Sequence, residues 1–153
     1  MRPRTSCTTP GSRKRTSADD PFDKGATVFR LGLIGDVMLG RRVDDDLADP
    51  HTAPAEVWGD LLPVFSTVDL RGVNLECVIS AIGRPDPGRV FHFRARYRAL
   101  EVLQAAHIDF VGLANNHVLD YGQDALLECV SLLRDHSIAA VEHLLTALPG
   151  LVE

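Results

Sequence analysis

Three short segments of the sequence carry acidic, amide and imidazole side chains that could bind a metal ion or move a proton. In the first, Asp36 follows Gly35, which has no side chain and lets other groups come close. A carboxylate in this setting suits a hard divalent cation. The same residue could instead cap the turn before a short helix, and the sequence leaves both interpretations of Asp36 open.

The second segment places an amide and a carboxylate two positions apart, at Asn74 and Glu76. Side chains at positions i and i+2 of an extended chain point to the same side, so both could face one ion. The alternative is a solvated strand edge, where the two side chains meet only water.

The third segment, Asn115-Asn116-His117, combines two amides with an imidazole. An Asn carbonyl oxygen can bind a metal ion, and a His can protonate a leaving oxygen or stabilise a phosphoryl group. Such groups are costly at the end of a buried apolar strand unless they have partners, so a function is favoured for Asn116 and His117. The alternative is a turn formed by the asparagines, and Asp120 is predicted to cap the next helix.

Each of the three segments follows a predicted strand, and helices are predicted between the strands. Apolar runs predict buried strands at 28–35 and 109–114, and further strands are predicted at 69–75, 90–94 and 138–141. Helical spacing predicts a helical turn at 41–47 and helices at 97–106, 123–135 and 55–68, the last interrupted by Pro63. This alternation predicts an α/β fold with a mostly parallel sheet. Ligands bind beyond the carboxyl ends of parallel strands, so the three segments are expected at that edge.

Composition and charge narrow the class of protein. The 153 residues hold 16 basic and 21 acidic side chains, and this net charge of −5 argues against a nucleic-acid partner or an anionic membrane surface. No apolar run approaches the roughly 18 to 20 residues of a membrane span. Residues 1–27 are basic and lack the apolar core of a signal peptide, so they are predicted to form a disordered leader. A cytoplasmic location is therefore predicted, with membrane association only through partners.

The three cysteines, Cys7, Cys77 and Cys129, include no C-x-x-C pair. An odd number without metal-ligand spacing predicts neither a disulfide framework nor a zinc site. Buried thiols in a reducing compartment are the expected form.

The three segments and their order resemble those of a known family. Gly-Asp-x-Met-x-Gly-Arg, then Asn-Leu-Glu, then Ala-Asn-Asn-His-x-x-Asp-Tyr-Gly is similar to the CapA-type capsule and poly-γ-glutamate synthesis proteins. The resemblance covers about residues 28–141, and the Asn-Asn-His block is its most distinctive part. CapA-type proteins resemble the calcineurin-like metallophosphoesterases, so the resemblance implies the N-terminal half of a layered α/β sandwich. Residues 142–153 do not match and are predicted to form a divergent tail.

The resemblance also implies roles for individual residues. It implies two divalent ions, manganese or zinc, in a centre whose ligands are Asp36, Glu76 and Asn116. Glu76 would bridge the ions, and His117 would meet the leaving oxygen of the substrate. The residues implied to orient the ligands are Asn74 and Asn115. Met38 stands where metallophosphoesterases usually have a His, a departure that CapA-type proteins share.

Two more residues are candidates for substrate binding. Arg41 could pair with an anionic substrate, and the alternative is a salt bridge on a surface helix that begins beside it. His92 lies between two phenylalanines and alternates onto the opposite face, where it either contacts the substrate or forms polar surface.

Three functions stay open at this point. The first is a metal-dependent, phosphoesterase-like hydrolase acting on a phosphate-containing or acyl-phosphate-like substrate in capsule or poly-γ-glutamate formation. The second is a non-catalytic scaffold or polymer-binding component of a synthesis or export complex, whose partners would be an anionic polymer and membrane components. The third is an inactive truncated fragment.

The third possibility comes from the end of the chain. The second half of the family supplies further His ligands in a Gly-His-x-His-like segment, which has no match here. We expect that the tail after Ala140 arises from a truncation or a change of reading frame. Half a sandwich would leave a strand edge and one apolar face uncovered, which would favour self-association.

Overall fold

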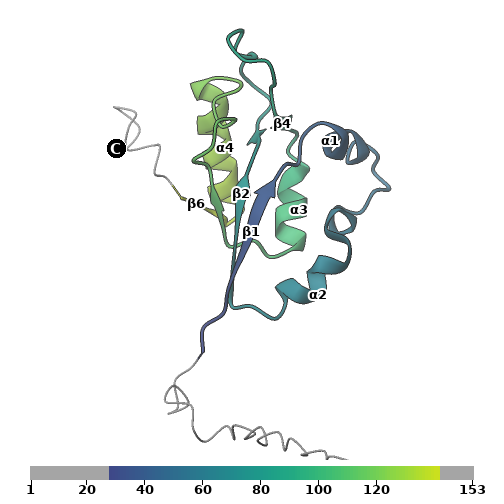
Figure 1. Cartoon of the computed structure of the whole chain (residues 1–153). Helices are drawn as coiled ribbons and strands as arrows, with labels where there is room; N and C mark the ends of the chain where they lie inside the picture. The colour runs from purple at the N-terminus through teal and green to yellow at the C-terminus, as the bar shows by residue number, and fades with distance from the viewer. Residues whose placement is uncertain (1–27, 142–153) are drawn as a thin grey trace, which may run out of the picture.

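The computed structural model describes residues 28–141, and the predicted leader (1–27) and tail (142–153) lie outside the described residues. Within the described part, a four-stranded sheet has the order β1-β2-β5-β6, and all neighbouring strands are parallel (Figure 1). Its strands are β1 (Leu31–Val37), β2 (Leu70–Leu75), β5 (Phe110–Gly112) and β6 (Ala139–Val141). A second parallel sheet pairs β3 (Val78–Ile79) with β4 (Arg94–Ala95). The predicted α/β fold with a mostly parallel sheet is confirmed.

Helices occupy the connections between the strands. They are α1 (Arg42–Asp46), the 3₁₀ helix η2 (Pro54–Leu61), α2 (Leu62–Phe65), α3 (Ala99–Ala105) and α4 (Gln123–Asp135). The predicted bounds of α4 are confirmed. The predicted helix at 55–68 is divided, because Gly59 has a φ of 55° inside η2 and Pro63 lies in the first turn of α2, where a missing N–H is tolerated. Of the helices in residues 28–141, none is long and apolar enough to cross a membrane.

Most of the predicted strand at 90–94 is a loop, and only its last residue enters β4. Polar groups of this segment bond to partners outside a strand ladder. The Phe93 N–H donates to the Asp120 carboxylate at 2.7 Å, and His92 Nε2 lies 2.7 Å from the Asp86 carbonyl oxygen. These two bonds tie the segment to a side chain and to a loop, and the Val78 N–H of β3 donates to the Phe93 carbonyl oxygen at 3.2 Å, directly before the strand pairing begins at Arg94.

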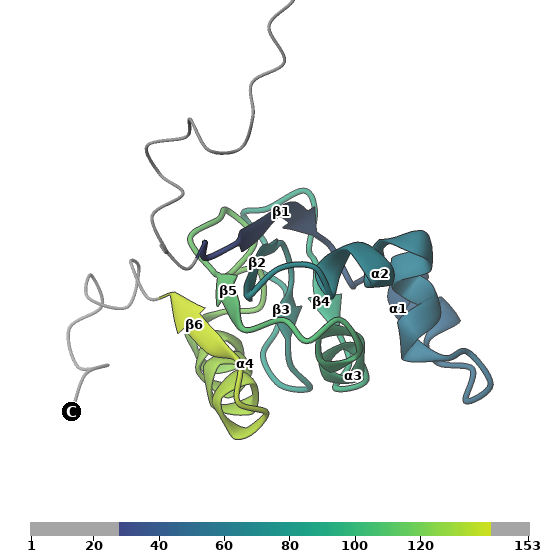
Figure 2. The same cartoon turned by 90° about the horizontal axis from the view of Figure 1, so that it is seen from below.

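The helices cover one face of the four-stranded sheet. Along the chain, the strands are added in one direction across the sheet, and right-handed crossovers that advance in one direction place every connection on the same face. Figures 1 and 2 show α3 and α4 on this side. There Val73 and Val111 of the sheet belong to one apolar cluster with Leu103 and Leu133 of the helices, and all four are at most 4% exposed. The hydrophobic core therefore lies between the sheet and the helices.

The opposite face of the sheet carries exposed apolar side chains. Leu31 and Leu33 of β1 are 49% and 71% exposed, and Val141 of β6 is 48% exposed. In the described part, β1 and β6 are also the edge strands. The prediction that residues 28–35 form a buried strand is therefore wrong, because an edge strand on an uncovered face keeps its apolar side chains in water.

The loop after β1 packs directly against β4. A Cβ atom at Gly40 would lie 2.6 Å from the Arg94 carbonyl oxygen, so this approach requires a glycine. The next residue, Arg41, has a φ of 55° and a ψ of −128°, a conformation that residues with a side chain rarely adopt. The close backbone contact therefore fixes the loop and holds Arg41 beside β4.

A carboxylate on α4 joins three parts of the fold. Glu128 accepts hydrogen bonds from Ser80 Oγ and Tyr97 Oη, both at 2.5 Å, and from the Ala81 N–H at 2.9 Å. These bonds stabilise the charged carboxylate and lower the pKa of Glu128, with the Ser80 hydroxyl as the largest cause. Glu128 therefore connects α4 to the segment after β3 and to Tyr97, which lies just before α3.

The two cysteines of the described part are buried, as predicted, and Cys7 lies outside the described residues. Desolvation raises the pKa of Cys77 to about 12 and that of Cys129 to about 11. Both thiols therefore stay protonated at neutral pH and act as small apolar side chains of the core.

We predict that Gly40→Ala lowers the free energy of unfolding by about 1 to 3 kcal/mol, because the added methyl group would meet a backbone carbonyl oxygen. Gly35→Ala is the matched control, since a Cβ atom at Gly35 has no neighbour within 4 Å. Urea unfolding of both variants, followed by circular dichroism, measures the difference. Equal stability of the two variants would contradict the close contact between the loop and β4.

The lowered pKa of Glu128 predicts a loss of stability in acid. Its charged carboxylate contributes fully above the ordinary pKa of 4.5, and the contribution is lost as the pH falls below that value. Glu128→Gln should lower the free energy of unfolding at neutral pH by about 1 to 3 kcal/mol, and this difference should shrink in acid. Thermal unfolding between pH 7 and pH 3 checks the prediction, with Glu101→Gln on exposed α3 surface as the control. A difference that does not depend on pH would rule out the charge as its cause.

Candidate functional site

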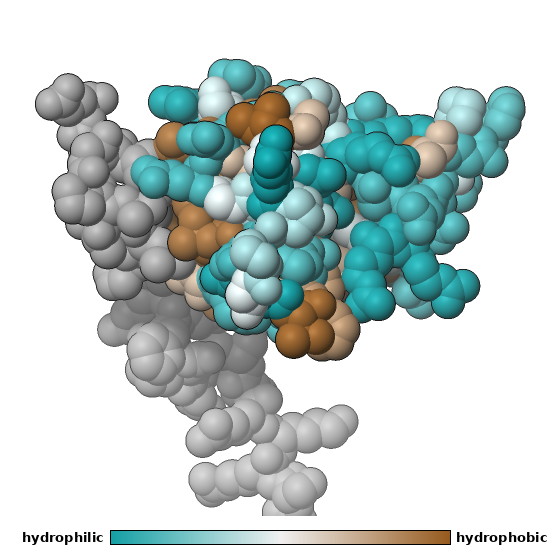
Figure 3. Space-filling model, turned by 90° about the horizontal axis from the view of Figure 1, so that it is seen from above, coloured by the Kyte–Doolittle hydropathy of each residue, from teal (hydrophilic) through white to brown (hydrophobic). Residues whose placement is uncertain are grey.

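The predicted metal-binding segments meet at the carboxyl edge of the sheet, an end of the molecule whose surface is mainly hydrophilic (Figure 3). In the strand register, Asp36 of β1 lies opposite Asn74 of β2. Asn74 Nδ2 donates a hydrogen bond to Asp36 Oδ1 at 2.6 Å, and Asn115 Nδ2 donates to Asn74 Oδ1 at 3.0 Å. A line of hydrogen bonds therefore joins the ends of β1 and β2 to the loop after β5.

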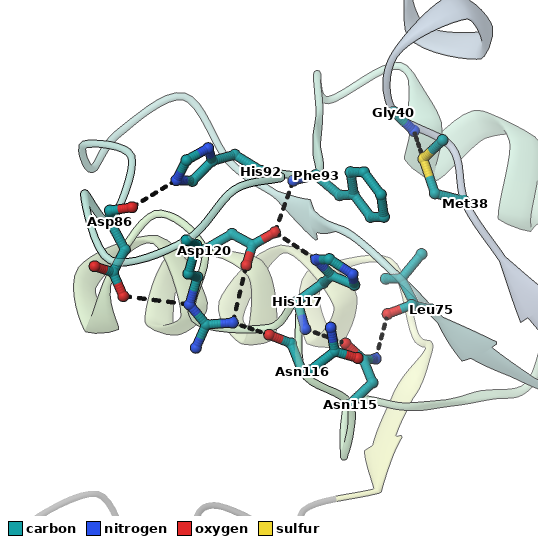
Figure 4. Close-up of polar contacts among 11 residues, drawn as sticks. Met38, Gly40, Leu75, Asp86, His92, Phe93, Asn115, Asn116, His117 and Asp120 are labelled. Carbon is teal, nitrogen blue, oxygen red and sulfur yellow. Dashed lines mark hydrogen bonds and ion pairs between the residues drawn. The ribbon is translucent and has the colours of Figure 1, made fainter.

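Asn115 also shapes the loop that follows β5. Its Nδ2 group donates to the Leu75 carbonyl oxygen at 2.9 Å, and its Oδ1 accepts the His117 N–H at 3.0 Å (Figure 4). The second bond closes a turn, which is the local role that the sequence left open for the asparagines. Asn115 therefore forms a turn and contacts the neighbouring strand at the same time, so that Asn116 and His117 follow directly after the strand end.

A buried carboxylate holds His117. Asp120 is 0% exposed, and its carboxylate lies 2.7 Å from His117 Nδ1, 2.7 Å from the Phe93 nitrogen and 3.1 Å from Arg89 Nη1 (Figure 4). An ionised carboxylate only accepts hydrogen bonds, so Nδ1 carries the proton and Nε2 is the nitrogen left for a substrate. The prediction that Asp120 caps the next helix is wrong. Gly122 is the N-cap of α4 and provides no side-chain bond, because the Asp120 carboxylate is turned inward to His117.

Aromatic packing fixes the face of the same imidazole. Phe93 stacks on His117 with the ring centroids 4.0 Å apart, and the Arg41 guanidinium carbon lies 5.7 Å from the centroid of the Phe93 ring. The His117 side chain is 13% exposed. Asp120 at the ring edge and Phe93 on the ring face together give the imidazole one orientation.

Arg89 is a site residue that sequence reasoning missed. Its Nη1 atom contacts Asp120 and the Asn116 carbonyl oxygen, and its Nε atom lies 3.2 Å from Asp86 Oδ2. Together with Asn116 and His117, it lines a small pocket of about 260 Å³. No local sequence signal could have indicated Arg89, because it lies in a turn-rich loop and its partners in the site, Asn116 and Asp120, are about thirty positions away.

The three predicted ligands lie near the same edge. Glu76 follows β2, and its N–H donates to the Val37 carbonyl oxygen at 3.0 Å, which places Glu76 beside the end of β1. Asp36 and Asn116 are exposed and Glu76 is half-buried. Within residues 28–141, no three His, Cys, Asp or Glu side chains lie close enough together to hold a metal ion. The predicted ligand set is two carboxylates and an amide oxygen, donors that suit a hard divalent cation but are few in number.

Met38 takes a structural role in the loop after β1. Its Sδ atom accepts a hydrogen bond from the Gly40 N–H at 3.1 Å (Figure 4). A thioether is a soft ligand and a weak hydrogen-bond acceptor, so it does not suit a site of hard oxygen donors. Met38 stands where metallophosphoesterases usually have a His, and its side chain stabilises the loop after β1.

Arg41 and His92, the predicted substrate-binding residues, line one cavity of about 550 Å³. Arg94, Arg96 and Tyr121 line it as well. Sequence reasoning missed these residues, although the two arginines stand at positions i and i+2, a spacing that places side chains on one side of an extended segment.

Comparisons with known proteins show what this chain is similar to. Two probable polyglutamine synthesis accessory proteins, from two strains of Mycobacterium tuberculosis, are each 28% identical to this chain over 147 residues. The match covers 74% of this chain and 38% of each relative, so the chain spans less than two fifths of the length of these curated relatives.

A family model described as "Bacterial capsule synthesis protein PGA_cap" matches residues 30–141. This range contains every predicted site residue, from Asp36 to His117. The match confirms the resemblance to CapA-type proteins on which the site residues were predicted. The chain belongs to the PGA_cap family of bacterial capsule synthesis proteins.

Proposed function

We propose that this chain carries a metal-dependent, phosphoesterase-like site that acts in the synthesis of an anionic capsule polymer of the poly-γ-glutamate type. The observation that carries the proposal is the pair formed by His117 and Asp120, with Nε2 of His117 left for a substrate. The His117 N–H donates to Asn115 Oδ1, and Asn115 is connected through Asn74 to Asp36 by side-chain hydrogen bonds. The substrate would be a phosphate ester or an acyl phosphate. Membrane components of a polymer synthesis complex are the proposed partners.

Asp36, Glu76 and Asn116 would hold the divalent ions. Their donors are all oxygens, which favours manganese or another hard cation over zinc, since zinc prefers sites with His or Cys ligands. When bound, such ions supply a Lewis acid and a nucleophilic water at neutral pH. Asn74 donates to one oxygen of Asp36 and so leaves the other oxygen for an ion. Because affinity depends on the number of ligands, we expect weak binding by these three residues alone.

His117 would act on the leaving oxygen of the substrate. Asp120 keeps the proton of the imidazole on Nδ1 and stabilises the doubly protonated form, which then donates from Nε2. Arg89 is only 32% exposed and lines the pocket next to His117, where its guanidinium can pair with a phosphoryl oxygen. His117 and Arg89, from two different loops, would therefore supply a proton and a positive charge at adjacent positions.

A non-catalytic, polymer-binding function is the second candidate. The cavity beside Arg41 and His92 favours it, because a cluster of cationic side chains binds an anionic chain without any chemical step. Dependence of phosphatase activity on a metal ion separates the two candidates.

Asp36→Ala should weaken manganese binding by about tenfold or more, because the variant loses a ligand carboxylate. Titration calorimetry of the full chain with manganese chloride measures this loss. Asp135→Ala, at the exposed end of α4, is the matched control and should bind manganese as the wild type does. Binding that is absent in the wild type, or equal in all three proteins, would contradict the proposed metal ligands.

Asp120→Asn should lower kcat for hydrolysis of p-nitrophenyl phosphate with manganese by about 100-fold or more, with KM little changed. The reason is that an amide no longer stabilises the protonated imidazole of His117, although it fills the same space. Asp86→Asn is the control, since Asp86 pairs with the same Arg89 from an exposed position. Thermal unfolding of both variants separates a loss of structure from a loss of activity. Equal losses of kcat in both variants would show that the effect passes through Arg89 and not through His117.

A further inference from the structure

The cavity of about 550 Å³ beside the His117 site concentrates positive charge. Residues 28–141 hold ten arginines against 16 acidic side chains and have no lysine. Three of these arginines, Arg41, Arg94 and Arg96, line this one cavity together with His92. In a chain that is acidic on average, such a local excess of guanidinium groups favours an anionic ligand.

Two of the three guanidinium groups have no acidic partner. Within residues 28–141, neither Arg41 nor Arg94 has a carboxylate oxygen within 4 Å. Asp44, the acidic residue that lines the cavity, pairs with Arg96 instead, at 3.4 Å. The alternative that Arg41 forms a surface salt bridge on α1 is therefore wrong. Arg94 lies over the Tyr121 ring, with 4.1 Å between its guanidinium carbon and the ring centroid. Aromatic rings thus hold both groups in place. Arg94 Nη1 donates to the Ile82 carbonyl oxygen at 3.4 Å, and the remaining N–H donors stay available for carboxylate or phosphate oxygens.

The remaining lining of the cavity distinguishes between kinds of anion. Asp44 is 13% exposed and also faces the cavity, as do the hydroxyl-bearing residues Ser80 and Tyr97. A polyphosphate has only acceptor oxygens, so it could accept from the arginines but could donate nothing to Asp44, which already pairs with Arg96. An acidic peptide-like chain carries carboxylates for the arginines and amide N–H groups for Asp44. The mixture of donors and acceptors in the cavity therefore suits an acidic peptide-like chain.

The cavity lies directly beside the catalytic imidazole. Arg41 lies against the Phe93 ring, and Phe93 stacks on His117. His92 and Phe93 are neighbours on one loop, and the first lines the cavity while the second contacts His117. An acidic peptide bound in the cavity would therefore have one end within reach of His117.

We propose that the arginine-lined cavity binds the acidic, peptide-like part of the substrate, with carboxylates on Arg41 and Arg94, and directs its phosphorylated end to His117. The inference rests on the proposed function only in identifying the bound acidic peptide as part of the enzyme's substrate. Binding in the cavity itself requires no metal ion, so the two can be tested apart.

The test is titration calorimetry of the full 153-residue chain with penta-γ-glutamate, in the presence of a chelator and at low salt. We expect saturable binding that Arg94→Ala weakens by about tenfold or more, because a charged hydrogen bond is lost. Arg134→Ala on exposed α4 is the matched control and should change the affinity less than twofold. Where Arg94→Ala does not fold, Arg41→Gly provides the test, since glycine accepts the φ of 55° without strain.

Three results would overturn the inference. They are absent binding of penta-γ-glutamate, equal weakening by Arg134→Ala, and binding of tripolyphosphate as tight as that of penta-γ-glutamate. The Asp36→Ala variant separates this inference from the proposed function. This variant should lose manganese binding and keep penta-γ-glutamate binding. If the wild-type protein binds penta-γ-glutamate but never hydrolyses a phosphate ester, the proposed function alone is refuted.

Discussion

The buried carboxylate of Asp120 is the interaction on which the site depends. A charge without solvent contact is tolerated only when donors surround it, and here the donors come from Arg89, the Phe93 backbone and His117. Two of these donors belong to the loop before β4 and one to the loop after β5. One carboxylate therefore joins the two loops and sets the orientation of the imidazole. The loop from Asp86 to Phe93 also bonds to the backbone oxygens of Asn116 and Asp120, but the carboxylate is the group that contacts Arg89, Phe93 and His117 together.

The sheet contributes a second constraint through its one-directional strand order. Because every crossover lies on the same face, the described part has no point at which the strand order reverses and a cleft opens between neighbouring strands. The site is built at the carboxyl edge instead, where Asn74 and Asn115 connect the strand ends by side-chain hydrogen bonds. The same topology leaves Leu31, Leu33 and Val141 exposed on the other face. The one-directional strand order therefore accounts both for the position of the site and for the exposure of that face.

The two cavities at this edge differ in their chemistry. The smaller one holds His117, Asn116 and Arg89, and the larger one holds a cluster of arginines with tyrosines and a carboxylate. Phe93 connects them, since it stacks on His117 and lies beneath the Arg41 guanidinium. A reacting group and a charged chain can therefore be bound at neighbouring positions by different residues. Because the two cavities have different linings, the proposed catalysis and the proposed polymer binding can be tested independently.

Local sequence determined the type of fold and most of its helices and strands, because apolar periodicity and turn residues act over a few positions; it did not determine the loop at 90–93 or the division of the helix at 55–68. The bounds of α4 and the strand-end positions of Asp36, Asn74 and Asn115 follow from such patterns. Tertiary structure alone decided that Asp120 faces His117 instead of capping α4, since the choice depends on Arg89 and Phe93 about thirty residues earlier. It also decided that β1 is an exposed edge strand, because an apolar run has the same sequence whether or not a neighbour covers it. Long-range partners and strand order leave no local trace, and these two features set the geometry of the site.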